Sequence, residues 1–160
     1  MNIILHIDDT YAPDVEPKQL QNAVITTLKT SSPNSPNDCS VAISVTGTDA
    51  VQQLNAQYRG VDKPTDVLSF ENTPDPDFPD ADPEMANYLG DIIIAYPVAQ
   101  IQARTAGHSV MAEVTLLVVH GTLHLLGFDH DTPANKKKMW LAQQQIMTQL
   151  GLPNVQPTEN

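Results

Sequence analysis

The sequence predicts a single α+β domain, in which a small mixed four-stranded sheet packs with about five helices. Four short runs have the β-branched, alternating character of strands, and five longer runs have the apolar spacing of helices. The order of the two kinds of element along the chain is mixed, as in α+β folds. The chain of 160 residues is long enough to bury one core, and neither an internal repeat nor a linker divides residues 1–160.

The expected strands cover residues 3–7, 40–46, 66–70 and 89–96. The expected helices cover roughly residues 17–30, 49–60, 97–107, 110–126 and 133–151. Thr48 or Asp49 is expected to cap the second helix, and Pro133 occupies the favoured first turn of the last one. The fourth helix is apolar nearly all round, which predicts a central, buried position.

Two segments are not expected to join the core. Residues 72–86 form an acidic, proline-rich loop that cannot bury enough apolar surface to order itself. This loop is either a solvated mobile loop or an acidic flap over a site. Residues 152–160 are expected to be a disordered tail.

The bulk composition limits the function classes. The net charge of −11 argues against a general polyanion binder and against adsorption to an anionic membrane, so neither DNA nor a membrane is an expected partner. Cys39 is the single cysteine, which excludes an intrachain disulfide and indicates a reducing compartment. The first residues lack the basic region and the long apolar run of a signal peptide, so we expect a cytoplasmic protein.

Three of the five histidines lie in the segment HGTLHLLGFDH, residues 120–130. On a helix, His120 and His124 differ by only about 40° in direction and about 6 Å in height, so both rings face the same way. Gly127 is expected to end the helix in a left-handed turn, which lets His130 approach the same point. Three imidazole nitrogens can hold a zinc ion and leave a fourth position for water, as in catalytic zinc sites. The alternative is that each histidine is a core residue satisfied by hydrogen bonds.

The spacing H-x-x-x-H-x-x-G-x-x-H resembles that of the metzincin peptidases. It therefore indicates a zincin-like domain with metal-binding histidines on the central helix and the turn after it. Those peptidases carry a glutamate directly after the first histidine, whereas this chain has Gly121 there. Because glycine can neither accept a proton nor orient water, peptide hydrolysis would need another base, such as Asp129.

A second segment, LNAQYRGVDKPTDVLSF at residues 54–70, is followed by LGDI at residues 89–92 and then by the histidine segment. Together the three segments resemble the YbeY family of bacterial rRNA-maturation endoribonucleases over roughly residues 40–150. The resemblance implies a zinc-dependent, single-strand-specific endoribonuclease that acts in small-subunit rRNA 3′ end maturation and in ribosome quality control. The implied partners are single-stranded rRNA, the small ribosomal subunit and its assembly proteins.

By the same resemblance, His120, His124 and His130 would bind one zinc ion, although three imidazoles also accept other divalent transition metals. Asp129, next to His130, could orient a ligand imidazole or act as a base, or it could only stabilise the turn. Glu113 lies about 10 Å from His120 along the same helix, which is too far for direct ligation.

Arg59 would be the cation in the substrate cleft, by the resemblance. An arginine fork suits a phosphodiester, which carries a negative charge, better than a neutral peptide bond. The alternative for Arg59 is a surface ion pair with Asp62 or Asp66.

The sequence leaves the reaction itself open. The nucleophile could be a water activated by the metal or the 2′-OH of the RNA. Two other functions also remain: a metallopeptidase-like hydrolase with a substitute base, and a non-enzymatic ribosome-assembly factor whose metal only holds the fold together. Because cations are few, we expect weak, salt-sensitive affinity for free RNA and a substrate that is presented on the ribosomal subunit.

Overall fold

The computed structural model describes residues 1–72, 77 and 87–157, and within this part of the chain the sheet has four strands. These are β1 (Asn2–Ile7), β2 (Ser40–Thr46), β3 (Val67–Glu71) and β4 (Tyr88–Ala95). Their spatial order is β1-β2-β4-β3. The first three strands in this order run parallel, and β3 runs antiparallel to β4 at the edge. The predicted mixed four-stranded sheet is confirmed.

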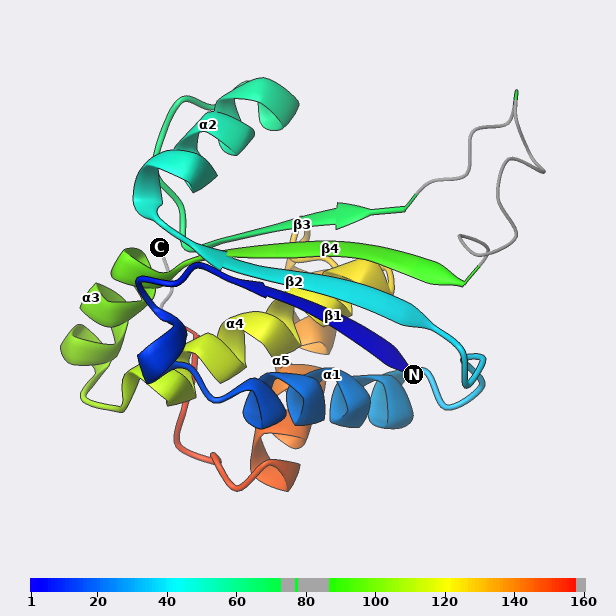
Figure 1. The fold of residues 1–160 in the computed structure, drawn as a ribbon. Coiled ribbons are helices and arrows are strands. Elements are labelled where there is room, and N and C mark those ends of the chain that lie inside the picture. The colour runs from blue at the N-terminus through cyan, green and yellow to red at the C-terminus, as the bar shows by residue number, and fades with distance from the viewer. Residues whose placement is uncertain (73–76, 78–86, 158–160) are drawn as a thin grey trace.

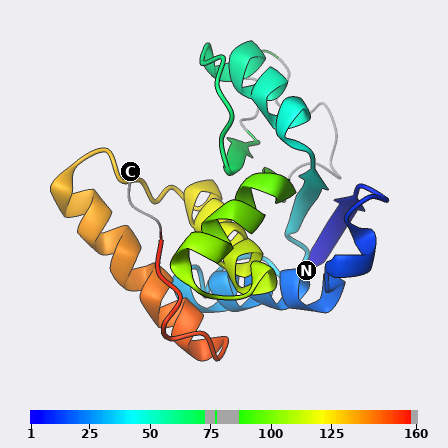
Figure 2. The ribbon, with the colours of Figure 1, turned by 90° about the vertical axis from the view of Figure 1, so that its left-hand side faces the viewer.

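The described helices are α1 (Pro17–Ser31), α2 (Thr48–Arg59), α3 (Tyr96–Ala106), α4 (Val110–Leu125) and α5 (Pro133–Gln149). A short 3-10 turn, η1 (Ala12–Asp14), is an addition that the sequence did not suggest. Figures 1 and 2 show α1, α3, α4 and α5 on one face of the sheet and α2 on the other. The predicted α+β architecture with five helices is therefore confirmed.

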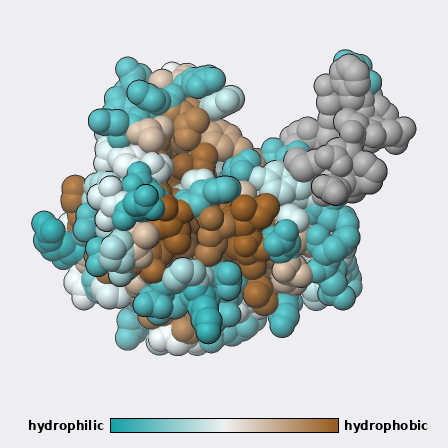
Figure 3. All heavy atoms as spheres, in the orientation of Figure 1, coloured by the Kyte–Doolittle hydropathy of each residue, from teal (hydrophilic) through white to brown (hydrophobic). Residues whose placement is uncertain are grey.

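The core lies between the sheet and the helical layer, and α4 crosses its centre. Twelve of the sixteen residues of α4 are buried, which confirms the central position expected from its apolar composition. The fully buried side chains around it come from the sheet and from α1 and α5, and include Leu20, Ile43, Ile92, Ile94 and Ile146. In the view of Figure 3, apolar side chains gather between α2 and the lower helices, while the outer surfaces of those helices are hydrophilic. None of the described helices combines the length and the apolar character needed to cross a bilayer.

Two local expectations need correction or completion. The N-cap of α2 is Gly47 and makes no side-chain cap hydrogen bond, so the prediction of a Thr48 or Asp49 cap is wrong. Asp49 instead lies in the first turn, where its charge favours the positive end of the helix dipole. Cys39 is buried at the entry to β2 and its thiol donates to the carbonyl of Pro36 over 2.7 Å, which agrees with a packing role.

The predicted acidic loop, 72–86, lies almost entirely outside the described residues, so neither interpretation of it is tested. The expected tail, 152–160, is described as far as Pro157. In that part Val155 is 8% exposed and packs against the main core, and the Leu152 amide donates to the Met147 carbonyl. Leu152 and Val155 therefore attach the first part of this segment to the core.

Candidate metal centre

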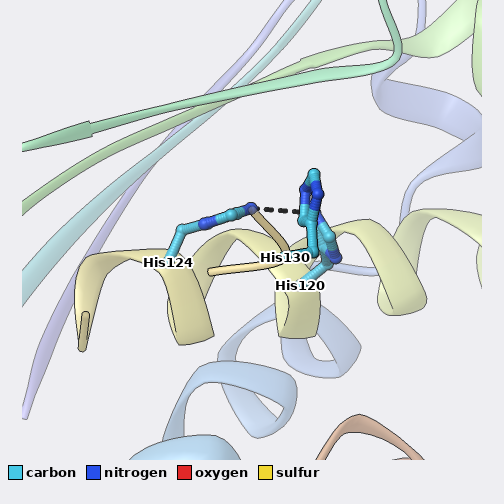
Figure 4. Close-up of side chains that lie close together, drawn as sticks. All are labelled: His120, His124 and His130. Atoms are coloured by element: carbon cyan, nitrogen blue, oxygen red, sulfur yellow. Dashed lines mark hydrogen bonds between the residues drawn. The ribbon is translucent and has the colours of Figure 1, made fainter. Parts of the chain in front are cut away.

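The three histidines of the 120–130 segment converge in space. His120 and His124 lie on the last two turns of α4, and their Nε2 atoms are 3.1 Å apart. Gly127 has a φ of 95°, in the left-handed region that glycine favours, and the chain reverses there to bring His130 alongside. One nitrogen of each ring lies within 4.8 Å of the other two (Figure 4). The predicted convergence is confirmed.

Hydrogen bonds fix how the two helical rings are oriented. Nδ1 of His124 is 2.9 Å from the Phe128 carbonyl oxygen, which can only accept, so Nδ1 carries the proton. Nδ1 of His120 lies 3.0 Å from Oε1 of Gln143 and donates to it in the same way. When neutral, both rings therefore present an Nε2 lone pair to the space between them, as metal-binding histidines do.

The donor set fits a transition-metal ion. Two ligands at about 2.0–2.1 Å from a tetrahedral ion lie roughly 3.3 Å apart, close to the 3.1 Å between the helical Nε2 atoms. Three imidazoles occupy three positions of such an ion and leave one for water or substrate. His120, His124 and His130 could thus hold one ion with an open coordination position.

The local environment keeps the helical histidines in the form that binds metal. Burial, and then the neighbouring His124, lower the pKa of His120 from 6.5 to about 4. Burial, and then His130, also lower the pKa of His124. Both rings are therefore neutral near pH 7 and need not lose a proton before binding a metal.

These shifts predict that the metal-free protein loses stability in mild acid. The folded protein holds fewer protons on His120 than the unfolded chain between pH 6.5 and the folded pKa of about 4, so stability falls as the pH falls through this window. We expect the free energy of unfolding, measured by urea titration after chelation, to drop by roughly 2 kcal/mol between pH 7 and pH 5. The matched variant His120→Gln should show a shallower drop, and equal slopes in the two proteins would contradict the prediction.

A cleft of about 790 Å³ opens beside the histidines, a size typical of ligand sites. Residues of α2, of β3 and of the turn after α4 line it.

Arg59, the last residue of α2, lines this cleft. Its Nη2 donates to the Ser69 carbonyl over 2.5 Å, and its guanidinium lies 5.4 Å from the centre of the Phe70 ring. Arg59 pairs with neither Asp62 nor Asp66: the Asp62 carboxylate accepts from Gln52, and the Asp66 carboxylate accepts from Gln102. Arg59 therefore presents a positive charge in the cleft that also contains the three histidines.

Asp129 also lines this cleft, but its hydrogen bond supports the turn. Its Oδ1 accepts from the backbone N–H of His130 over 2.7 Å. The groups that orient the helical imidazoles are instead Gln143 and the Phe128 carbonyl. The geometry thus favours the turn-stabilising role of Asp129.

Comparison with known proteins agrees with this geometry. A family model described as endoribonuclease YbeY matches residues 6–151. The chain belongs to the YbeY family. Relatives named endoribonuclease YbeY include those of Brevibacillus brevis, 40% identical over 87% of this chain and 93% of the relative, and of Chloroflexus aurantiacus, 48% identical over 74% of this chain and 77% of the relative. The relative of Moorella thermoacetica is 47% identical over 72% of this chain and 75% of its own length.

A solved structure shares the fold. The solution structure of TM1509 from Thermotoga maritima superposes with a TM-score of 0.57 and 23% sequence identity, and the match covers 99% of both chains. At this identity the likeness concerns the architecture alone. It extends over both the sheet and the histidine-bearing helix.

In this YbeY-family chain, Gly121 is required by packing. A Cβ atom at this position would lie 2.9 Å from Cγ2 of Ile92 and 3.0 Å from Oγ of Ser69, closer than ordinary contact. The position faces the sheet, so the glutamate that metzincin peptidases carry here would collide with β3 and β4. This finding weighs against the peptidase alternative for a steric reason that the sequence did not reveal.

Gly121→Ala is expected to destabilise the fold. Overpacking costs about 1–3 kcal/mol, and the better helix propensity of alanine returns up to about 1 kcal/mol. We therefore expect a net loss of roughly 1–2 kcal/mol in the free energy of unfolding, measured by urea titration. A variant as stable as the wild type would show that Ile92 and Ser69 can move aside.

The sequence missed two groups near the centre. One is Gln143, a buried polar residue among the inward-facing residues of α5; its position four residues after Met139 and three before Ile146 was the available signal. The other is a buried polar network. Glu113 accepts from Gln102 over 2.9 Å and lies 2.5 Å from Nε2 of His108. A role of Glu113 in a polar network could be guessed from the sequence, but its partners Gln102 and His108 could not.

Proposed function

We propose that the protein is a zinc-dependent endoribonuclease that cuts single-stranded RNA. His120, His124 and His130 are the zinc ligands in this proposal, and Arg59 contacts the phosphodiester. One observation carries it: two imidazoles with fixed Nε2 lone pairs and a third imidazole converge in the wall of a cleft that also contains Arg59. The family name of the relatives, endoribonuclease, supports the same substrate class.

Each residue has a defined task in this proposal. A zinc ion at the site supplies Lewis acidity toward a phosphate oxygen and lowers the pKa of bound water. Arg59, held by Ser69 and lying over the Phe70 ring, offers its remaining N–H donors to the phosphate oxygens. Because its charge is already in position, little reorganisation is needed as negative charge grows during cleavage.

Aromatic side chains in the cleft favour unpaired RNA. The rings of Tyr58 and Phe70 line it with their centres 5.5 Å apart, and Tyr58 is 63% exposed. Unstacked bases pack on exposed aromatic rings, whereas bases inside a duplex cannot reach them. These rings support the single-strand preference.

We further propose that the substrate is rRNA of the small ribosomal subunit, processed at its 3′ end and during quality control. The net charge of −11 gives little general attraction to RNA. The subunit and its assembly proteins would therefore present the strand. Affinity for naked single-stranded RNA should be weak at physiological salt and should fall steeply as salt is raised, as a filter-binding titration would reveal.

A chelation experiment tests the core of the proposal. The protein is incubated with matched single-stranded RNA, duplex RNA and casein, before and after chelation and then with zinc restored. We expect cutting of single-stranded RNA alone, lost on chelation and recovered with zinc. Mapping of the product ends identifies the nucleophile, because a 2′,3′-cyclic phosphate is the product of attack by the RNA 2′-OH.

The other outcomes identify the competing functions. Casein cleavage without RNA cleavage would establish the peptidase. Unfolding on chelation, together with no cutting of RNA by the zinc-loaded protein, would establish the non-enzymatic assembly factor.

A further inference from the structure

A second pocket adjoins the histidine cluster, between α4 and α5. Its volume is about 350 Å³, and it shares Asp66, His120 and His130 with the larger cleft. A phosphodiester placed at the cluster would therefore border both pockets. None of the steps proposed above uses this second pocket.

Gln143 brings a buried polar group to the wall of this pocket. Its side chain is 1% exposed and its Oε1 accepts from His120, which fixes the direction of the amide. The Nε2 atom is buried on the opposite branch and finds no hydrogen-bond partner among the described residues. A buried N–H without a partner is unfavourable, so a ligand acceptor that reached this atom would be bound with a corresponding gain.

The remaining lining defines which molecule fits. Leu116, Leu117 and the Trp140 ring supply apolar and aromatic walls. The carboxylates of Glu113 and Asp66 can accept hydrogen bonds, and they repel a phosphate group. A flat, uncharged ring system with donors and acceptors on its edge matches these walls, and a nucleobase is such a molecule.

Since the protein is proposed to bind RNA, we infer that this pocket is a nucleobase subsite. It receives the base of a nucleotide next to the phosphodiester at the histidine cluster, and Gln143 donates from Nε2 to an acceptor on that base. Lys136 also lines the pocket, with Nζ 5.5 Å from the centre of the Trp140 ring, and can meet the phosphate attached to that nucleotide. Gln143 thus has two roles: its Nε2 contributes to nucleotide specificity, and its Oε1 positions His120.

The test uses the indole N–H resonance of Trp140, the single tryptophan of the chain. The zinc-loaded full chain is titrated in turn with the four nucleoside 5′-monophosphates and with ribose 5-phosphate. We expect nucleotides to shift the indole resonance and the side-chain amide resonances of Gln143 to saturation. Ribose 5-phosphate, which has no base, should move neither.

Gln143→Glu separates the two roles of the residue. The glutamate keeps an oxygen for His120 but replaces the donor by an acceptor, so nucleotide affinity, compared at equal zinc occupancy, should fall at least about tenfold. Gln145→Glu, at an exposed position of α5, adds the same charge and should bind as the wild type.

Three results would overturn the subsite. The wild-type Gln143 amide resonances could stay unshifted when nucleotides are added, or they could shift equally with ribose 5-phosphate. A zinc-loaded Gln143→Glu variant could also bind nucleotides with unchanged affinity. The wild-type amide resonances decide the matter even if the variant does not fold. Because mononucleotides contain no phosphodiester bond, failure here leaves RNA cleavage untouched. Loss of the cleavage proposal, in turn, would show in the chelation experiment.

Discussion

His124→Ala is expected to abolish stable zinc binding and to lower RNA cleavage by a factor of about a thousand or more. His124 supplies one of the three converging nitrogens, and its Nδ1 is already bonded to the Phe128 carbonyl. Alanine removes this donor and leaves two imidazoles, which hold an ion far more weakly. Elemental analysis of the purified variant, together with end-mapping of RNA incubated with it, measures both effects.

The matched control is His6→Ala. His6 is an exposed residue of β1 that lies outside the histidine cluster. The control should retain one zinc per chain and full cleavage. A His124→Ala protein that keeps its zinc, or one that cuts RNA at the wild-type rate, would contradict the assignment of this ligand.

Arg59→Ala should lower RNA cleavage about a hundredfold or more while zinc content stays the same. The residue contributes a pre-positioned charge in the cleft and no ligand to the ion, so its loss affects the phosphodiester alone. Arg59→Lys keeps the charge but lacks the planar fork, and it should recover only part of the activity. Initial rates on one single-stranded RNA, with zinc measured in parallel, test both variants.

Arg104→Ala provides the comparison for charge alone. Arg104 is exposed in the last turn of α3 and does not line the cleft. This variant should cleave as the wild type does. Equal losses in Arg59→Ala and Arg104→Ala would mean that Arg59 acts through general attraction to RNA rather than through contact with the substrate.

Local sequence signals predicted the part of the centre that depends on neighbours in the chain. The i, i+4 spacing of His120 and His124 and the glycine at 127 were sufficient to place three rings together, because helix geometry and the left-handed turn are local properties. The positions of the five helices and four strands followed from periodicity for the same reason. The prediction of the α2 cap was wrong by one or two residues, because helix ends are the least precisely encoded part of an element: the N-cap is Gly47, and Thr48 and Asp49 are already helical.

The remaining features of the fold and of the metal centre depend on contacts between segments that are distant in the sequence. The order of the strands and the reversed direction of β3 arise from packing across the whole sheet, and no local pattern encodes them. The steric demand at Gly121 comes from Ile92 and Ser69, 29 and 52 positions earlier in the chain. The partner of His124 is a backbone carbonyl, which has no residue signature at all.

The position of β3 at the margin of the sheet has a consequence for what can settle in the cleft. The Asp66 carbonyl accepts from the Ala95 amide of β4, and the Asn72 amide donates to the Leu89 carbonyl of β4, so the polar backbone groups of every second residue along β3 face β4. Ser69 is one of the residues in between, and its carbonyl therefore turns outward. Uncovered margins of this kind recruit further polypeptide strands and promote aggregation. Arg59 donates to that outward carbonyl of Ser69. The backbone N–H of an incoming extended peptide would therefore find this acceptor already occupied by the Arg59 side chain. Arg59, which is proposed to contact the phosphodiester, thus also occupies an acceptor that strand pairing along this margin would use.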